Sequence, residues 1–183
     1  GLTQRISLGP NAYNYGHPSL SSDGLTLYFT SDMPGGQGGK DIWRCTKEAG
    51  GWSKAENLGT SINTPFDETY PFITGDTLCY ASNGLPGLGG LDMFMSRLIN
   101  NIPSTPVNMR APINSSGDDF GLIFLTDEIG MVSSNRSGGA GDDDIHSFKY
   151  IRLKASGIVT DSTATPIANA VVTIIAESDS TVL

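Results

Sequence analysis

The sequence is 183 residues long, which is enough for one or two domains with a buried core. It is 38% hydrophobic and holds 23 glycines and 10 prolines, so we expect dense turns and short strands. The formal net charge of −8 argues against binding to nucleic acid or to an anionic membrane surface. No apolar run in the sequence approaches the roughly 20 residues that a membrane-spanning helix needs.

Both ends of the sequence interrupt a pattern. It opens at "GLTQRISLG" without an initiator methionine, a signal-like start or a nearby cysteine that could accept a lipid. It stops inside an apparent strand at "SDSTVL". We therefore expect the sequence to be part of a longer protein.

Short strands separated by turns are predicted along the N-terminal part. We expect Leu2–Leu8 to be the outer strand of a preceding repeat unit. The segment "HPSLSSDGLTLYFTS" predicts strands at Pro18–Ser21 and Leu25–Ser31, and the Asp-Gly pair between them supplies the positive φ of a tight turn. After a glycine-rich loop, "DIWRCTKE" predicts a third strand, and "GGWSKAENLG" turns at Gly50–Gly51 into a fourth.

The glycine-rich segment occurs three times with nearly constant spacing. In each copy, a serine is followed by Asp or Asn, glycines stand at offsets five and seven from the serine, and aspartate stands at offset ten. The serines lie 51 and then 52 residues apart, and the segments "NLGTSINTPFDE" and "NMRAPINSSGDD" also lie 51 residues apart. The copies are Ser31–Trp43, Ser82–Phe94 and Ser134–His146.

Four short antiparallel strands in a period of about 50 residues are typical of a β-propeller blade. We therefore predict an all-β fold in which residues 1–152 form a partial β-propeller of about three four-stranded blades. The blades are predicted at residues 17–59, 70–109 and 120–150. Since propellers close with about four to eight blades, the rest of the ring is expected outside this sequence.

A second domain is predicted at residues 153–183, where the repeat stops and the composition shifts to Ala, Val, Thr and Ile. Apolar and polar residues alternate at Ile158–Thr160 and again at Ala170–Ile174, with a turn through Asp161–Pro166 between them. This pattern predicts the first hairpin of a transthyretin-like β-sandwich.

The segment "GGAGDDDIH" matches the nine-residue glycine-aspartate calcium repeat of parallel β-helices. Its ligand position falls on Asp143, whose counterparts in the other copies, Lys40 and Leu91, could not hold a cation. A metal site at Asp142 and Asp143 is left as an alternative for the last copy. The acids that do recur stand one residue later, and we expect them to accept hydrogen bonds from backbone N–H groups within the loop. These recurring acids are Asp41, Asp92 and Asp144.

Paired carboxylates are the first candidates for catalysis, but their spacing favours a structural role. The pairs Asp67–Glu68 and Asp118–Asp119 lie 51 residues apart, so they repeat with the fold. Acids that recur in every unit indicate loop architecture rather than acid–base hydrolysis. No Cys/His cluster has zinc spacing, and no glycine-rich loop precedes a predicted helix. We therefore predict a non-enzymatic protein with no catalytic residues and no cofactor.

The histidines and cysteines are also interpreted as packing residues. His17 aligns with Tyr70, and His146 replaces an aromatic residue of the other copies. Cys45 and Cys79 lie in apolar strand segments and are predicted to be small buried thiols. A disulfide between them stays open, because spacing alone does not show whether two strands lie within bridging distance.

Aromatic residues in the connections between predicted blades are candidates for partner binding. Tyrosine buries much area at little cost in conformational entropy, which suits a protein interface. Packing between neighbouring blades is the alternative for the same side chains. The candidate interaction surface consists of Tyr13, Tyr15, Phe66 and Tyr70.

The turn Pro-x-x-Ser-x-Asp-Gly and the loop Ser-Asn-Arg resemble the WD40-like (PD40) repeat of TolB-type β-propellers. With "INTPFDE", "GGQGGKDIW" and "SSNRSGGAGDDDI", the sequence is similar to a variant in OmpA-family periplasmic proteins of the Bacteroidetes envelope. In that family the terminal blade, here Ser133–Ile145, precedes a carboxypeptidase-regulatory-like sandwich. His146 stands where the family usually has tyrosine. The start of the sandwich is matched by Gly157, Val159, Asp161, Pro166, Ile167, Ala170 and Val172.

The resemblance implies a PorE-type periplasmic protein, associated with the outer membrane and linked to type IX secretion and gliding. Its implied role is a scaffold that docks envelope proteins, such as outer-membrane or secretion-ring components, without spanning the membrane. Peptidoglycan binding in that family belongs to a domain absent from this sequence, so it is assigned to none of these residues. A Tol-like envelope-integrity protein and a carbohydrate-processing enzyme that uses the propeller face are the alternatives.

Overall fold

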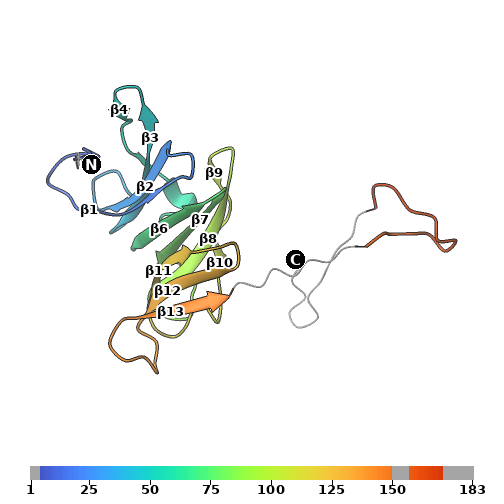
Figure 1. The fold of residues 1–183 in the computed structure, drawn as a ribbon. Coiled ribbons are helices and arrows are strands. Elements are labelled where there is room, and N and C mark those ends of the chain that lie inside the picture. Colours follow the sequence, from blue (N-terminus) through green and yellow to red (C-terminus); the bar gives the residue numbers. More distant parts are fainter. Residues whose placement is uncertain (1–4, 150–156, 171–183) are drawn as a thin grey trace. The chain divides into compact units, whose positions relative to one another are not determined.

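The computed structural model describes residues 5–149 and 157–170, and the chain divides into two compact units, residues 1–150 and 151–183. The described residues form antiparallel β-sheets and one short 3₁₀ turn at Gly59–Ser61 (Figure 1). The predicted all-β fold class is therefore confirmed. Within the described ranges, no helix is long and apolar enough to span a bilayer.

Three antiparallel sheets follow one another along the first unit, one for each copy of the sequence repeat. Sheet 1 consists of β1 (Tyr15–Leu20), β2 (Thr26–Ser31), β3 (Asp41–Glu48), β4 (Gly51–Trp52) and β5 (Glu56–Asn57). Sheet 2 consists of β6 (Glu68–Thr74), β7 (Thr77–Ser82), β8 (Asp92–Ile99), β9 (Ile102–Pro103) and β10 (Val107–Asn108). Sheet 3 consists of β11 (Asp119–Phe124), β12 (Ile129–Ser134) and β13 (Asp144–Lys149).

The pairing pattern repeats from sheet to sheet. In each sheet the second strand lies between the first and the third, and the repeat serine stands opposite the repeat aspartate, as in the pair Ser31–Asp41. The predicted fourth strand of sheet 1 is in fact two short strands, β4 and β5, which both pair with β3. Between them the Ser53 hydroxyl, rather than a backbone carbonyl, accepts the hydrogen bond from the Thr46 N–H (3.0 Å), so the ladder is interrupted there.

Two strand boundaries differ from the sequence prediction. The first strand was expected at Pro18–Ser21, but β1 already pairs with β2 at Tyr15, because its two segments are separated by a bulge. Of the predicted strand Leu2–Leu8, residues 5–8 form no strand, and the others lie outside the described residues. An outer strand needs a neighbouring strand to satisfy its backbone, and the described chain supplies none beside this segment.

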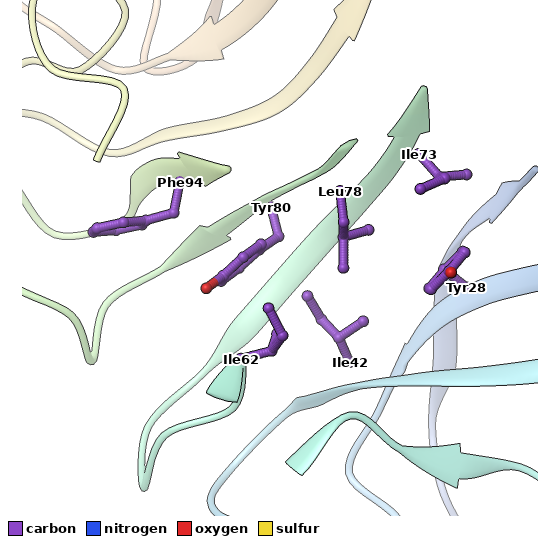
Figure 2. Close-up of a cluster of buried hydrophobic side chains, with 7 residues drawn as sticks. All are labelled: Tyr28, Ile42, Ile62, Ile73, Leu78, Tyr80 and Phe94. Carbon is purple, nitrogen blue, oxygen red and sulfur yellow. The ribbon is translucent and has the colours of Figure 1, made fainter. Parts of the chain in front are cut away.

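The core of the first unit lies between the sheets, because the middle strands β2 and β7 are buried on both faces. Successive residues of a strand point to opposite sides, so Leu78 and Tyr80 of β7 face sheet 1 while Cys79 and Ala81 face sheet 3. Figure 2 shows the first cluster, in which side chains of sheets 1 and 2 meet. It consists of Tyr28, Ile42, Ile62, Ile73, Leu78, Tyr80 and Phe94.

Two further clusters extend this arrangement along the chain. The cluster between sheets 2 and 3 consists of Cys79, Ala81, Met93, Ile113, Leu122 and Val132. The cluster on the other face of sheet 1 consists of Leu27, Phe29, Met33, Trp43 and Cys45. The middle strands β2 and β7 thus carry an apolar run at their centre, within "TLYFTS" and "TLCYAS", whereas burial alternates along β12.

In the second unit the described residues contain a turn rather than a complete sheet. The Asp161 carboxylate accepts hydrogen bonds from the N–H groups of Thr163 and Thr165 (both 2.9 Å), as in an Asx turn. Thr160 and Pro166 form an isolated antiparallel bridge on either side of it. The predicted turn at Asp161–Pro166 is therefore confirmed, whereas the predicted strand Ala170–Ile174 lies almost entirely outside the described residues.

Truncation of a fully buried side chain should test the importance of the clusters. Leu78 is 0% exposed, so Leu78→Ala should lower the free energy of unfolding by about 2 to 5 kcal/mol through lost burial and a residual cavity. Urea denaturation followed by tryptophan fluorescence would measure the change. Leu25→Ala, at a side chain that is 51% exposed, is the control and should change it by about 0.5 kcal/mol or less. Equal effects of the two variants would contradict the assigned core.

Candidate functional site

The recurring loop aspartates act as predicted. One carboxylate oxygen of each, Oδ2, accepts hydrogen bonds from backbone N–H groups of its own glycine-rich loop, at 2.5 to 3.2 Å. The donors are Gln37 for Asp41, Leu88 and Gly89 for Asp92, and Ala140 and Gly141 for Asp144. The prediction that these acids hold the loops is therefore confirmed.

The glycine at offset five leaves room for this carboxylate. A Cβ atom built at Gly36 would lie 1.7 Å from Oδ2 of Asp41, and one built at Gly87 would lie 1.9 Å from Oδ2 of Asp92. Since real atoms do not approach so closely, only glycine fits beside the aspartate. The glycine-aspartate spacing of the repeat is thus a packing requirement of the loop.

The two aspartates of the alternative metal site lie on the surface. Asp142 and Asp143 are exposed in the loop before β13. Among the described residues, no group of three or more His, Cys, Asp or Glu side chains could hold a metal ion.

The connectors between sheets, residues 58–67 and 109–118, are held by buried asparagines, whose role was not recognised from the sequence. Asn63 is 2% exposed, and its amide accepts from the Ile42 N–H (2.8 Å) and donates to the Ile42 carbonyl (3.0 Å). Asn114 repeats this arrangement with the N–H (2.7 Å) and carbonyl (2.9 Å) of Met93. Each asparagine pairs with the strand backbone as a neighbouring strand would.

The second acid of each predicted pair is buried at the start of a sheet. Glu68 is 0% exposed and accepts hydrogen bonds from the Thr64 N–H, the Thr64 hydroxyl and the Ser82 hydroxyl, all at 2.7 Å. Burial raises the pKa of Glu68, and these hydrogen bonds act in the opposite direction. The first acid of the pair, Asp67, accepts from the Lys40 N–H (2.8 Å) of the preceding loop. Both carboxylates therefore join the connector to the sheets.

Sheet 3 begins with the same arrangement but adds an ion pair between a buried aspartate and a partly buried arginine. Asp119 is 0% exposed and accepts from the Ser115 N–H (2.6 Å) and from Nη2 of Arg136 (2.6 Å). The same guanidinium donates to the carbonyls of Pro112 (2.9 Å) and Ile113 (2.6 Å). The arginine of the Ser-Asn-Arg loop thus holds the connector against sheet 3. The motif was visible in the sequence, but its spacing did not show these partners.

A small cavity lies where the first strands of the three sheets meet. Its volume is about 220 Å³, and equivalent positions of the repeat line it, namely His17–Ser19, Tyr70–Phe72 and Gly121–Ile123. The rings of His17 and Tyr70 stack with centroids 3.8 Å apart and an interplanar angle of 19°. The Tyr70 ring also lies 5.0 Å from that of Phe120. Residues from all three sheets therefore build one aromatic surface.

The backbone at this cavity is strained. His17 and Tyr70 occupy the left-handed region, with φ of 49° and 52°, and the equivalent residue of sheet 3 is Gly121, with φ of 64°. Each lies at a register break in the first strand of its sheet. Left-handed conformations cost a bulky residue about 1 kcal/mol or more, and such strain is concentrated at functional sites. This cavity is therefore the candidate functional site.

The electrostatics of the site favour a neutral imidazole. Burial lowers the pKa of His17, and the positive charge of Lys40 lowers it further. Nδ1 of His17 is buried without a hydrogen-bond partner among the described residues. His17 also lines a second hollow of about 220 Å³ with Asn14, Asp32 and Lys40. A neutral stacked ring beside such hollows suits a planar or aromatic group of a partner.

The four aromatic residues predicted as an interaction surface lie in three different surroundings. Tyr13 and Tyr15 pack against the cluster on the outer face of sheet 1, and the Tyr15 hydroxyl donates to the carbonyl of Pro10 (2.8 Å). Tyr70 lies in the stack at the cavity. Phe66 is 59% exposed. Packing, the alternative considered for these side chains, thus describes three of the four, and their role in partner binding stays a prediction.

The other singled-out residues are structural in position. Cys45 and Cys79 are buried free thiols, which confirms the predicted burial and answers the disulfide question. Burial raises their pKa to about 11 and about 12, respectively. His146 is half-buried in β13, opposite Val132 of β12.

Neither a protein-family profile nor a curated protein sequence matches the chain. The class of the protein is therefore defined by its architecture. It is an all-β protein built from a repeated antiparallel sheet, with connectors held by side-chain hydrogen bonds.

Removal of a connector asparagine should destabilise the fold strongly. In Asn114→Ala, the buried N–H and carbonyl of Met93 lose their partners, so the free energy of unfolding should fall by about 2 kcal/mol or more. Urea denaturation would measure it. Asn11→Ala, at an exposed asparagine, serves as the control. A loss of less than about 0.5 kcal/mol for Asn114→Ala would show that the bonds do not hold the connector.

Glu68 should give the stability a characteristic pH dependence. Because its folded pKa lies above the ordinary value of 4.5, the folded state retains a proton that the unfolded state releases, and stability falls as the pH rises through the folded pKa. Glu68→Gln removes this titration. The difference in unfolding free energy should therefore shift in favour of the variant as the pH rises above the ordinary pKa of 4.5. A shift in favour of the wild type would contradict the assigned direction.

Proposed function

We propose that the chain is a non-enzymatic interaction module: about three blades of a WD40-like β-propeller, followed by the start of a transthyretin-like sandwich. The observation that carries this proposal is the use of the repeated carboxylates. Asp41 and Asp92 hold their loops, and Glu68 and Asp119 are fully buried in hydrogen bonds that join connector and sheet. Groups fully used by the scaffold are poorly placed to act on a substrate.

Three features of the sheets support the propeller interpretation. Each sheet packs face to face on the next through its middle strand. The first strands β1, β6 and β11 are neighbours, as expected for the innermost strands of adjacent blades (Figure 1). The connector leads from the last strand of one sheet directly to the first strand of the next. A ring of about four to eight such sheets would close.

The cellular setting is proposed from the sequence motifs. The repeat and the module order resemble OmpA-family proteins of the Bacteroidetes envelope. We therefore place the protein in the periplasm, associated with the outer membrane, as a PorE-type component of the type IX secretion and gliding machinery. Its partners are then outer-membrane or secretion-ring proteins, and attachment to peptidoglycan would require another domain.

The carbohydrate-processing alternative finds little support in the site. Glycoside hydrolysis requires two carboxyl groups that both reach the scissile bond. The paired acids instead contain one buried member each, Glu68 and Asp119. A Tol-like role in envelope integrity uses the same interaction chemistry, so the identity of the captured partner distinguishes it.

Capture from envelope extracts tests the proposal. The 183-residue chain, immobilised and exposed to a detergent extract of a Bacteroidetes envelope, should enrich secretion-ring components, as measured by mass spectrometry. Phe66→Ser, at a side chain that is 59% exposed, should reduce this capture by about tenfold without lowering the melting temperature. Ile99→Ser, at a side chain that is 62% exposed, is the matched control and should capture normally. Enrichment of Tol–Pal proteins instead would favour the envelope-integrity alternative.

A further inference from the structure

The second hollow beside His17 lies where sheet 1 lacks a side chain that the other sheets have. All of its lining residues fall within residues 14–40, and its volume is about 220 Å³. At this level, one residue of the first strand stands opposite one residue of the second strand in every sheet. These pairs are Gly16–Thr30, Thr69–Ala81 and Phe120–Ser133. A Cβ atom built at Gly16 would meet no atom within 4 Å, so the position is open in sheet 1.

Two polar groups of the lining residues are buried without a hydrogen-bond partner among the described residues. They are the hydroxyl of Thr30, a residue that is 3% exposed, and Nδ1 of His17. Buried polar groups are nearly always paired with protein, water or a ligand, because an unpaired one is costly. Two such groups at one hollow therefore indicate a polar molecule that completes their hydrogen bonds.

Two charged side chains also line the hollow. The Asp32 carboxylate accepts hydrogen bonds from the N–H (2.8 Å) and from Nδ2 (2.6 Å) of Asn14, and these bonds lower the pKa of Asp32. The backbone of Lys40 is held by the connector, because its N–H donates to Asp67 (2.8 Å) and its carbonyl accepts from the Glu68 N–H (2.7 Å). Within the described part of the chain, the Lys40 ammonium group forms no ion pair, so it is available to a ligand.

The chemistry of these groups favours a neutral ligand with several hydroxyls. Asp32 and the net charge of −8 repel an anion, and Lys40 repels a cation. A hydroxyl both donates and accepts, so it can bond to the carboxylate, to the ammonium group, to Thr30 and to either tautomer of a neutral His17. The volume lies below the roughly 300 to 1,000 Å³ of pockets for drug-sized ligands, which suits a single sugar ring.

We propose that the hollow lined by Gly16, Thr30 and Lys40 binds one ring of a neutral sugar through its hydroxyl groups. Asp32 accepts hydrogen bonds from these hydroxyls and Lys40 donates to them, while Thr30 and His17 gain the partners that they lack. The site binds the sugar without cleaving it, because glycoside hydrolysis requires two carboxyl groups. Among the described residues that line the hollow, Asp32 alone carries a carboxylate. The interaction module thus gains a small-molecule site built by sheet 1 alone.

Titration of the whole chain with monosaccharides is the first test. The probes are glucose, galactose, mannose and N-acetylglucosamine, and the amide signals of isotope-labelled protein are followed by NMR. At least one probe should shift the signals of Gly16 and Thr30, with a Kd of about 1 mM, as expected for a small neutral ligand. L-alanine, a zwitterion, and acetate, an anion, are the comparison probes and should bind at least about tenfold more weakly.

A side chain at Gly16 should close the hollow. Because its Cβ position is open and its φ lies outside the left-handed region, Gly16→Val should fold without a lower melting temperature. The variant should weaken sugar binding by about tenfold or more, because the valine side chain takes the space of the ligand. Gly50→Val is the matched control, since a Cβ atom at Gly50 also meets no atom within 4 Å and Gly50 is not a lining residue. It should bind like the wild type.

Thr30→Val separates a role in binding from a role in folding. Valine keeps the shape of the side chain and removes a hydroxyl that has no partner among the described residues, so the melting temperature should stay constant or rise. Sugar binding should weaken by about threefold to tenfold, the value of one hydrogen bond. Thr69→Val is the matched control, because the Thr69 hydroxyl is also buried without a described partner but belongs to sheet 2. It should bind like the wild type.

Three outcomes would overturn the inference. Absence of binding for every sugar up to about 50 mM would show that the hollow holds water only. Binding of L-alanine or acetate in place of the sugars would show a site for a charged ligand. Normal sugar binding by Gly16→Val or by Thr30→Val would place the sugar elsewhere on the protein.

Discussion

The structure depends on an interaction that joins each sheet to the next: a connector asparagine pairs with the backbone of the third strand. Asn63 and Asn114 bring the connector against the sheet that it leaves, at Ile42 and Met93. The adjacent isoleucines, Ile62 and Ile113, then fill the space between sheets. The polar contact sets the position of the connector, and apolar burial stabilises the sheet that follows.

The buried acids Glu68 and Asp119 also join the connectors to the sheets. In sheet 3, Asp119 is neutralised by Arg136, whereas Glu68 at the equivalent position in sheet 2 accepts hydrogen bonds from neutral groups. The two junctions therefore bury a carboxylate at the same position but satisfy it with different partners, an arginine in sheet 3 and neutral donors in sheet 2. The candidate site lies where this scaffold brings its first strands together, and there His17 and Tyr70 occupy strained conformations.

Features with a local cause could be predicted from the sequence. The repeat period, the central strands, the loop-binding role of Asp41 and the Asp161 turn all follow from short-range spacing. Features with a long-range cause could not be predicted. Asn63 and Arg136 bond to backbone groups far away in the sequence, and the bulge at His17 moves the start of β1. Residues 5–8 of the strand expected at Leu2–Leu8 form no strand, because a strand pattern does not supply its own partner.

Because β7 is buried on both faces, the stability of the first unit depends mainly on contacts between neighbouring sheets, as in other repeat proteins. Sheet 2 contributes to both inter-sheet clusters, so unfolding of sheet 2 would remove the packing contacts of both neighbouring sheets at once. The terminal sheets each share only one such cluster among the described residues. Local opening should therefore begin at the two ends of the array and reach β7 last.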